Sequence, residues 1–423
     1  EKILAAYRKD REPYMEKTGP YRLLSPAGRP STTPAIVDYL IQTAISKGAS
    51  DLHLSINRHH KAETPYVVRI RIHGKLHAVK SDVITNNYRE IIARFKILSN
   101  LDTTETSIPQ DGQITLMTQD NSVFVIRTNT IPSQDGEELV ARIQSADEKI
   151  LTLDQLAMTK EMVQRMRTVL YQKSGMIVLN GPAGSGKTTT IYSLLNTLAS
   201  PERKIITAED PIEAYLPYVS HMQVSQKSSF ATLGRAFMRQ DADVIFVGEI
   251  RDIDSATATV QLAQTGHLVL TTLHTRDSIG VIPRLKALEI HPNFIATSLI
   301  ASLSQRLVAR LCASCKVEYT PDGYIVTKMN EIAPPPENTR FFRAGEGCHE
   351  CTKGYIGRLP IYELFMIDPE LADHINREMA TTDLRRAAVQ KGMRSLAEEA
   401  LYRVYGGYVD LDSVYSYIFG PEY

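Results

Sequence analysis

A glycine-rich stretch, GMIVLNGPAGSGKTTT at residues 175–190, limits what this chain can fold into more than any other part of the sequence. A strand-like apolar run leads into the pattern G-x-x-x-x-G-K-[ST], and a helix-like segment follows it. In this pattern the glycines let backbone N–H groups face one anionic centre, Lys187 reaches the outer phosphates, and the Thr188 hydroxyl can join the shell of Mg²⁺. The stretch therefore predicts a site for a nucleoside triphosphate with Mg²⁺.

The alternative is an ordinary glycine turn between a strand and a helix that happens to carry a lysine. The match to the pattern is complete and lies between a predicted strand and a predicted helix, which favours the nucleotide site. The residues that we expect to bind the nucleotide are Gly181, Pro182, Ala183, Gly184, Ser185, Gly186, Lys187, Thr188 and Thr189.

Length and charge restrict the class of protein further. A chain of 423 residues exceeds the size at which one hydrophobic core stops growing, so two or more domains are expected. Lys and Arg together number 48, as do Asp and Glu, and the formal net charge of zero argues against a general nucleic-acid binder. No apolar run approaches the roughly 18 residues of a membrane span, and no secretory signal opens the chain. We therefore expect a soluble, cytoplasmic protein.

The first part of the chain divides into an arm and a small domain. Residues 1–33 are polar, contain several prolines and have no sustained periodicity, so we expect an arm or linker. Residues 34–148 combine helical apolar spacing with strand-like alternation, which predicts an N-terminal α+β domain.

Residues 149–423 predict a second domain of the α/β class. After a linking helical segment at 151–173, strand patterns alternate with helical patterns, as in a parallel sheet. The predicted strands are 176–180, 204–208, 244–248 and 267–271. Because ligands of such sheets lie at the carboxyl ends of the strands, the four strand ends should converge on Lys187.

Titratable residues lie beside three of these strands. The acidic segment 209–213 follows the second strand, and Glu249 follows the third, where an acid can hold Mg²⁺ through water or take a proton from an attacking water. His267 starts the fourth strand and His274 follows its end. Taken singly, Asp210 could be a helix N-cap, Glu249 a surface acid and each histidine a core residue. Their joint occurrence in one P-loop domain favours a catalytic site.

Four cysteines form two C-x-x-C pairs in the last third of the chain. Paired C-x-x-C motifs supply four thiolates for a tetrahedral Zn²⁺, and the alternatives are free buried cysteines or a redox pair. We expect a zinc-binding element at 305–362, with His349 outside the metal shell, and a helical end at 363–423. The predicted ligands are Cys312, Cys315, Cys348 and Cys351.

The assembled motifs resemble the secretion ATPase family that powers type II secretion and type IV pilus assembly. The resemblance rests on GPAGSGKTTT from 181, AEDPIE at 208–213, VGEIRD at 247–252, TGHLVLTTLH at 265–274, ASDLH at 49–53 and PQDG at 109–112. It implies a RecA-like P-loop domain with a smaller N-terminal α+β domain, PAS-like in the family, and a tetracysteine insert. The implied cofactors are ATP, Mg²⁺ and Zn²⁺.

The resemblance also implies roles for individual residues. ATP would lie between an N-terminal domain and a P-loop domain of a homo-hexamer, with arginines offered across the cleft. Arg127 and Arg142 match the arginines that contact the terminal phosphate, although the residues alone indicate only exposed strand arginines. The other matches are Glu249 as the activator of water, Glu209 and Glu213 as the acidic box that helps with Mg²⁺, His267 and His274 as the histidine box that senses nucleotide state, and Arg69 and Arg71 as further basic residues.

The implied function is a cytoplasmic ATPase motor, peripherally associated with the inner membrane of a bacterium. It would drive assembly of a type IV pilus or type II secretion pseudopilus through a polytopic inner-membrane platform protein, with a cytoplasmic or membrane-linked docking protein. No specific nucleic acid is expected, and the tetracysteine favours assembly over retraction. The alternatives are a pilus retraction ATPase, a conjugative or DNA-uptake ATPase, and a nucleotide-binding structural ring with little hydrolysis. Larger family members carry a further N-terminal domain, which this member lacks or which precedes the given residues.

Overall fold

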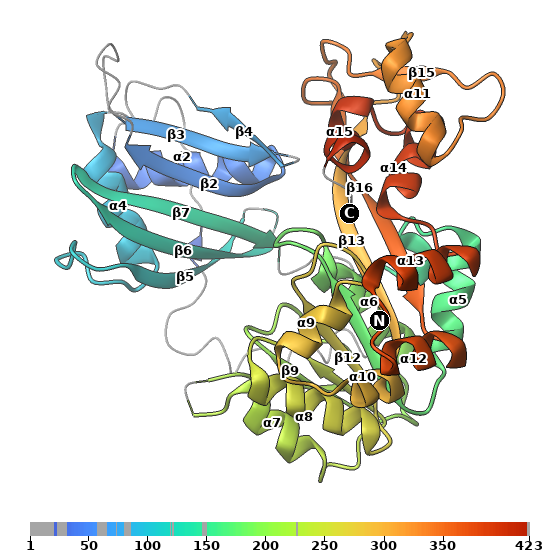
Figure 1. The fold of residues 1–423 in the computed structure, drawn as a ribbon. Helices are drawn as coiled ribbons and strands as arrows, with labels where there is room; N and C mark the ends of the chain where they lie inside the picture. Colours follow the sequence, from blue (N-terminus) through green and yellow to red (C-terminus); the bar gives the residue numbers. More distant parts are fainter. Residues whose placement is uncertain are drawn as a thin grey trace. The chain divides into compact units, whose positions relative to one another are not determined.

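A computed structural model describes residues 21–22, 32–56, 66–72, 74–79, 86–118, 120, 122–145, 150–225 and 227–420. The chain divides into two compact units, residues 1–149 and 150–423 (Figure 1). Most of the predicted arm, at 1–20 and 23–31, lies outside the described residues.

Unit 1 is built on a seven-stranded sheet with the strand order β1-β5-β6-β7-β2-β3-β4. All neighbouring strands are antiparallel except β1 and β5. The strands are β1 (Tyr21–Arg22), β2 (Ala49–Ile56), β3 (Tyr66–Ile72), β4 (Lys75–Ala78), β5 (Gln110–Met117), β6 (Val123–Ser133) and β7 (Gly136–Ser145). The prediction of a smaller N-terminal α+β domain is confirmed.

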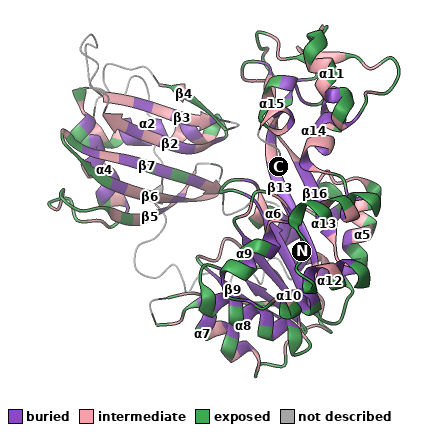
Figure 2. Ribbon diagram, viewed as in Figure 1, coloured by how far each residue is buried: buried purple, intermediate pink, exposed green. Residues whose placement is uncertain are grey.

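One face of this sheet is covered by α2 (Thr33–Ser46) and α4 (Tyr88–Leu98) (Figure 1). Alternate strand residues, such as Leu52 and Leu54, join apolar residues of both helices in one buried cluster. Since successive side chains of a strand point to opposite faces, Asp51 and His53 stand on the other face. Buried and partly exposed residues alternate along β3 in the same way (Figure 2).

Unit 2 contains a second seven-stranded sheet with the order β10-β9-β11-β12-β8-β13-β16. Every neighbouring pair is parallel except β13 and β16. The strands are β8 (Gly175–Asn180), β9 (Ile205–Glu209), β10 (Val219–Gln223), β11 (Val244–Val247), β12 (Leu268–Leu273), β13 (Leu299–Leu311) and β16 (Tyr355–Met366). The α/β class and the four predicted parallel strands are confirmed, within a residue or two at their ends.

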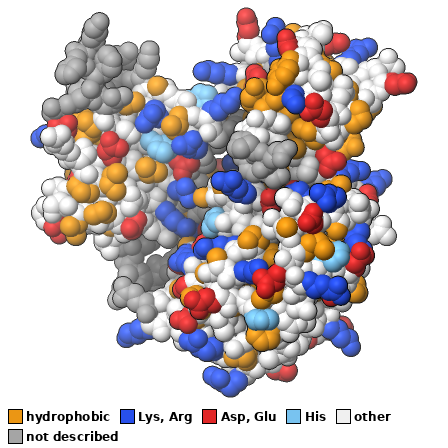
Figure 3. Space-filling view, in the orientation of Figure 1, with side chains coloured by type: hydrophobic (Ala, Val, Ile, Leu, Met, Phe, Trp, Pro, Cys, Tyr) orange, Lys and Arg blue, Asp and Glu red, His pale blue; other side chains and the backbone are white. Residues whose placement is uncertain are grey.

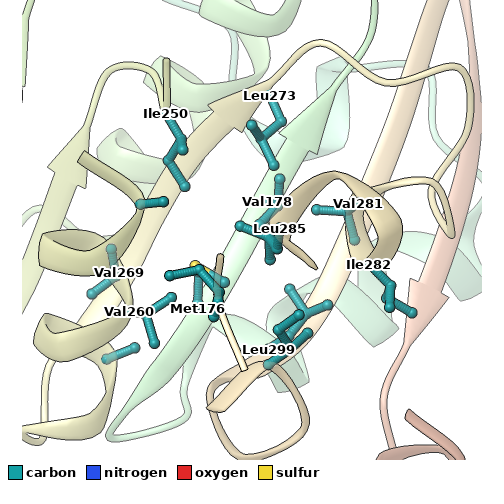
Figure 4. Packing of buried hydrophobic residues seen from close by; sticks show 14 of the residues in the cluster. Met176, Val178, Ile250, Val260, Val269, Leu273, Val281, Ile282, Leu285 and Leu299 are labelled. Atoms are coloured by element: carbon teal, nitrogen blue, oxygen red, sulfur yellow. The ribbon is translucent and has the colours of Figure 1, made fainter. Parts of the chain in front are cut away.

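Helices cover both faces of this sheet, and the fully buried β8 contributes to two cores. Met176 and Val178 belong to one cluster, in which Val260 and Leu285 from helices pack against the sheet (Figure 4). Residues 177 and 179 point to the opposite cluster. The helical elements are η2 (Leu153–Gln155), α5 (Lys160–Leu170), α6 (Lys187–Leu198), α7 (Phe230–Phe237), α8 (Ile253–Gln264), α9 (Val281–Ala287), α10 (Pro292–Ser298), α11 (Gly323–Ile332), α12 (Pro369–Asn376), α13 (Thr381–Gln390), α14 (Leu396–Tyr405) and α15 (Leu411–Phe419).

The structure differs from the predicted element boundaries in the last third of the chain. Residue 305 lies inside β13 and residue 362 inside β16, because these two strands stay paired from Ala301 to Leu311, beyond the end of β8. The helical end accordingly begins at Pro369. The cysteine-bearing element between the two strands adds only β14 (Val317–Tyr319), β15 (Phe341–Arg343) and α11. The predicted linking helix is also shorter, since 151–173 contains η2 and α5 with irregular backbone between them.

Acidic and basic side chains are interspersed over the visible face of unit 2, as the zero net charge suggests (Figure 3). Among the residues that the structure describes, none of the helices combines the length and the apolar character needed to cross a membrane.

Candidate nucleotide site and tetracysteine cluster

The glycine-rich loop connects the end of β8 at Asn180 to the start of α6 at Lys187. Gly181, Gly184 and Gly186 have φ values of 146°, 75° and 87°, a region that favours glycine. Space also excludes larger residues, because a Cβ on Gly181 would lie 2.5 Å from the Gln305 carbonyl oxygen and one on Gly186 would lie 2.7 Å from Gln305 Nε2. The loop thus follows the path that its sequence pattern predicts.

Lys187 folds back over this loop. Its Nζ donates to the carbonyl oxygens of Gly181 at 2.6 Å and Pro182 at 3.0 Å. Burial lowers the pKa of Lys187 to about 8, with Glu249 opposing the shift and Arg306 adding to it. The amino end of α6 points its free N–H groups and its positive dipole end at the same place, which suits an anion.

Strand β13 lies next to the loop, and its side chains contact the residues at both ends of the loop. The Gln305 side chain accepts from Thr190 Oγ1 at 2.7 Å, and Asn180 Nδ2 donates to Ser302 Oγ at 2.8 Å. Arg306 is buried and donates to the Gln305 carbonyl at 2.9 Å. Gln305 and Arg306 were not predicted as site residues, because they lie more than a hundred residues from the loop and belong to no local motif.

Glu249 and His274 lie together at the loop, as predicted. His274 Nδ1 is 2.9 Å from the Gly181 carbonyl oxygen, and its Nε2 is 3.3 Å from Glu249 Oε1. Both ring nitrogens therefore face acceptors, and the ring can donate to both only as the imidazolium. Arg251 Nε donates to Glu249 Oε2 at 2.8 Å, and its NH1 donates to Asp210 at 3.2 Å. Arg251 was missed although it stands inside the VGEIRD motif, where only the acid was singled out.

Glu209 has a different environment from Glu249. It is buried at the end of β9, where Thr207 Oγ1 and His221 Nδ1 contact one carboxylate oxygen and the Tyr192 hydroxyl contacts the other. The role of Glu209 with Mg²⁺ stays a prediction, and the contacts that are seen belong to a buried network. Glu213 contributes its backbone N–H to the Tyr192 hydroxyl at 3.2 Å.

His267 lies at the other edge of the sheet. Leu268, at the start of β12, pairs with Gly175, whereas Leu273 pairs with Asn180 beside the loop. Five residue steps along a strand separate these edges, about 16 Å. The His267 ring instead contacts the Leu262 carbonyl oxygen at 3.0 Å, near the end of α8. Within one chain His267 therefore lies away from Lys187, and its role in sensing nucleotide state stays a prediction.

Three of the four predicted arginines of unit 1 lie in one row across its sheet, and Arg69 pairs with His53 beside that row. Arg127 on β6 pairs with Arg142 on β7, Arg142 pairs with Asp51 on β2, and Asp51 pairs with Arg71 on β3. Directly opposite residues share a face, and this face is the one that α2 and α4 leave uncovered. Asp51 accepts from Arg142 Nε at 3.1 Å and lies 3.6 Å from Arg71 Nε. Arg142 keeps 58% of its side chain exposed, so it remains accessible in this unit.

The four cysteines converge at the ends of β13 and β16. Their sulphur atoms all lie within 4.8 Å of one another, with separations of 3.7 Å for Cys312 and Cys348 and 3.5 Å for Cys315 and Cys351. A tetrahedral site with Zn–S bonds of about 2.3 Å has sulphur atoms about 3.8 Å apart, so the cluster fits the ion. His349 is 88% exposed and lies outside the cluster. The predicted tetracysteine cluster is confirmed.

Fold and site together define a P-loop nucleotide-binding protein with a tetracysteine element. The sequence matches the family described as type II/IV secretion system protein over residues 29–416. The chain therefore belongs to the type II/IV secretion system ATPase family.

Curated relatives agree with this assignment. The chain is 36% identical over 385 residues to the type II secretion system protein HxcR of Pseudomonas aeruginosa, covering 90% of this chain and 76% of that protein. It is 34% identical to the type IV pilus assembly ATPase PilB of Thermus thermophilus, covering 91% of this chain and 43% of that protein. For the type IV pilus assembly ATPase TfpB of Acinetobacter baylyi, the identity is 37% and the coverage is 90% of this chain and 64% of that protein. The chain thus spans less than two thirds of the length of the two pilus relatives.

Solved structures share the fold. The Legionella pneumophila ATPase DotB is similar with a TM-score of 0.69 at 18% identity, covering 95% of this chain and all of that one. The pilus retraction motor PilT with bound ADP is similar with a TM-score of 0.58 at 22% identity, covering 89% of this chain and 95% of that one. At these identities the likeness concerns the fold alone.

Proposed function

We propose that this chain is the motor subunit of a bacterial filament-assembly machine, hydrolysing ATP to add subunits to a type IV pilus or type II secretion pseudopilus. The observation that carries the proposal is the placement of Glu249 and His274 against the loop that carries Lys187. A site that only stored nucleotide would not need a carboxylate held at the loop by an arginine and a histidine. The similarity to the pilus assembly ATPases PilB and TfpB supports the assembly role, and the similarity to HxcR supports type II secretion as the alternative system.

The chemistry assigns a task to each group. The loop N–H groups and Lys187 bind the outer phosphates, and the Thr188 hydroxyl would hold Mg²⁺, which neutralises charge on the phosphates when it is bound. Glu249 accepts a proton as water attacks the γ-phosphorus, and the bond to the β-phosphate oxygen breaks to give ADP and phosphate. Glu213 orients water and metal from the acidic box. His274 joins the loop carbonyl to Glu249 and so senses whether phosphates occupy the loop.

A second copy of the chain completes the site in this proposal. In a homo-hexamer, the open face of unit 1 would offer Arg127 and Arg142 to the terminal phosphate. Arg142 is 58% exposed, and Arg127 stands directly beside it on the same face, which supports this role. Positive charge supplied in this way stabilises the transition state, and arginines of this kind are worth roughly 10³ to 10⁵ in rate in other nucleotide hydrolases.

The proposed partners are a polytopic inner-membrane platform protein and a cytoplasmic or membrane-linked docking protein, with no specific nucleic acid. The motor would therefore work in the bacterial cytoplasm at the inner membrane. We further propose that Cys312, Cys315, Cys348 and Cys351 hold one structural Zn²⁺ per chain. The separations of their sulphur atoms support four-coordinate binding. This element favours assembly over retraction.

A phosphate-release assay tests the proposal. The purified chain, assembled into rings, should release phosphate from ATP only when Mg²⁺ is present. Nucleotide binding without Mg²⁺-dependent release would instead identify a structural ring component. Pull-down of the platform protein by the ATP-bound chain tests the assembly role, and capture of single-stranded DNA in its place would point to a DNA-uptake machine.

A further inference from the structure

A buried hydrogen-bond network surrounds Glu209 at the end of β9. One carboxylate oxygen is contacted by Thr207 Oγ1 at 2.5 Å and by His221 Nδ1 at 2.7 Å, and the other accepts from the Tyr192 hydroxyl. The side chains of His221 and Glu209 are 1% and 4% exposed. A carboxylate this deeply buried is stable only when its charge is satisfied by such donors.

The contacts of His221 fix its protonation. The backbone N–H of Leu216 donates to His221 Nε2 at 3.1 Å, so this nitrogen is an acceptor without a proton. The proton therefore sits on Nδ1, which donates to Glu209. As a neutral imidazole, His221 joins the buried carboxylate to the backbone of the segment that follows it.

Tyr192 joins the same segment to the P-loop helix. Its hydroxyl accepts from the backbone N–H groups of Glu213 and Ala214, both at 3.2 Å, while it donates to Glu209. Burial beside Glu209 raises the pKa of Tyr192, so the hydroxyl keeps its proton. Tyr192 lies on α6, the helix that begins at Lys187. The Tyr192 hydroxyl thus links the helix that follows the phosphate-binding loop to residues 209–214 through hydrogen bonds.

The tied segment leads to the proposed catalytic carboxylate. Asp210 follows Glu209 and accepts from Arg251, whose Nε donates to Glu249. A shift of this segment would therefore move Arg251 and with it the Glu249 carboxylate. A displacement of about 1 Å at a reacting group costs on the order of 100-fold in rate.

We propose that Tyr192 and His221 are positioning residues for hydrolysis. Through their hydrogen bonds to Glu209 they hold residues 210–216 in a fixed position relative to the P-loop helix, and this fixes the position of the Glu249 carboxylate. Both side chains are buried, and the proposal gives neither of them a contact with the nucleotide. The inference rests on the proposed function, because it concerns the same site.

Tyr192→Phe removes the hydroxyl and keeps the ring. We expect kcat to fall on the order of 10-fold to 100-fold while KM for ATP changes less than about twofold, because the loop and Lys187 are untouched. Tyr405→Phe is the matched control, since Tyr405 donates one hydrogen bond to the Ala333 carbonyl in a different core cluster. Its kcat should stay at the unmodified value. Equal kcat values for the two variants would overturn the proposal.

Two substitutions of His221 separate positioning from packing. A glutamine carries one donor and one acceptor, so His221→Gln should keep kcat within about threefold of the unmodified chain. His221→Leu leaves Glu209 without one donor and the Leu216 N–H without an acceptor, and it should match Tyr192→Phe. Equal losses in both His221 variants would mean that only the ring shape matters and would contradict the proposal.

Hydrogen exchange makes the network testable without turnover. Amides of residues 213–216 should lose protection in Tyr192→Phe and keep it in Tyr405→Phe, measured by mass spectrometry on the whole chain. Unchanged protection overturns the proposal. If the unmodified chain releases no phosphate, the proposed function fails, and the exchange result alone then decides whether Tyr192 ties the two segments together.

Discussion

The surroundings of Lys187 change the pKa of its ammonium group. Its ammonium is removed from water by the loop and lies near the buried cation Arg306, and these effects outweigh the attraction of Glu249. The pKa of Lys187 is therefore lowered from 10.5 to about 8. A bound triphosphate brings several negative charges to this ammonium and favours its charged form.

The lowered pKa predicts a pH-dependent nucleotide affinity. Below about pH 8 Lys187 is charged in the free chain, and affinity should be flat; above about pH 8 binding must take up a proton, so affinity should fall as the pH rises. Titration with a fluorescent ADP analogue from pH 7 to 9.5 measures this, and calorimetry in buffers of different ionisation enthalpy measures the proton uptake. A constant affinity across this range, without proton uptake, would contradict the assignment.

At the residue scale, the sequence predicted those site residues that belong to contiguous motifs. The loop, Glu249 and His274 were found because local spacing encodes them. Gln305 and Tyr192 were missed because their contacts come from strand pairing and helix packing, which no short pattern records. His267 was predicted at the start of its strand and lies there, at the edge of the sheet opposite the loop, so its role stays a prediction.

At the scale of elements, β13 connects the loop to the tetracysteine cluster. Its middle residues lie under the P-loop, and Cys312 follows directly after its last residue. Beyond the loop, β13 pairs only with β16 in the described sheet, and its last residue leads directly into the cysteine-bearing element. The boundary predicted at residue 305 failed because the strand pattern continues through it.

Removal of the metal should therefore destabilise the cysteine-bearing part of unit 2. A structural zinc site contributes folding free energy, so chelation of Zn²⁺ should destabilise residues 312–351 while ADP affinity changes less than about threefold. Hydrogen exchange of that segment and ADP titration on the same sample measure both effects, and elemental analysis should find one zinc per chain before chelation. The double substitution Cys348→Ser and Cys351→Ser should reproduce the loss. Unchanged exchange after complete metal removal would contradict a structural role.

At the scale of the whole molecule, neither unit contains all the groups that the proposed site needs. The phosphate loop and Glu249 belong to unit 2, whereas the arginine row with the exposed Arg142 belongs to unit 1. The division into an antiparallel unit and a parallel unit was predictable from periodicity, since strand alternation and strand–helix alternation differ. The alignment of the arginines in one row could not be predicted, because it depends on the register of four paired strands.

Arg142→Ala should lower turnover in assembled rings by roughly 10³-fold, because the transition state loses a positive group. Arg310→Ala is the control, an arginine near the end of β13 to which the site assigns no task. Phosphate release at saturating ATP, with ring assembly checked by light scattering, gives both values. Near-normal turnover would remove Arg142 from the site.

The central claim is that ATP bound at the loop of 181–189 is hydrolysed with Glu249 as the proton acceptor. The most direct test compares bound nucleotide and phosphate release for Glu249→Gln, with Glu289→Gln, an exposed acid outside the site, as control. We expect Glu249→Gln to bind ATP with unchanged affinity, to retain it uncleaved, and to release phosphate at least about 10² times more slowly. Normal phosphate release by Glu249→Gln would contradict it.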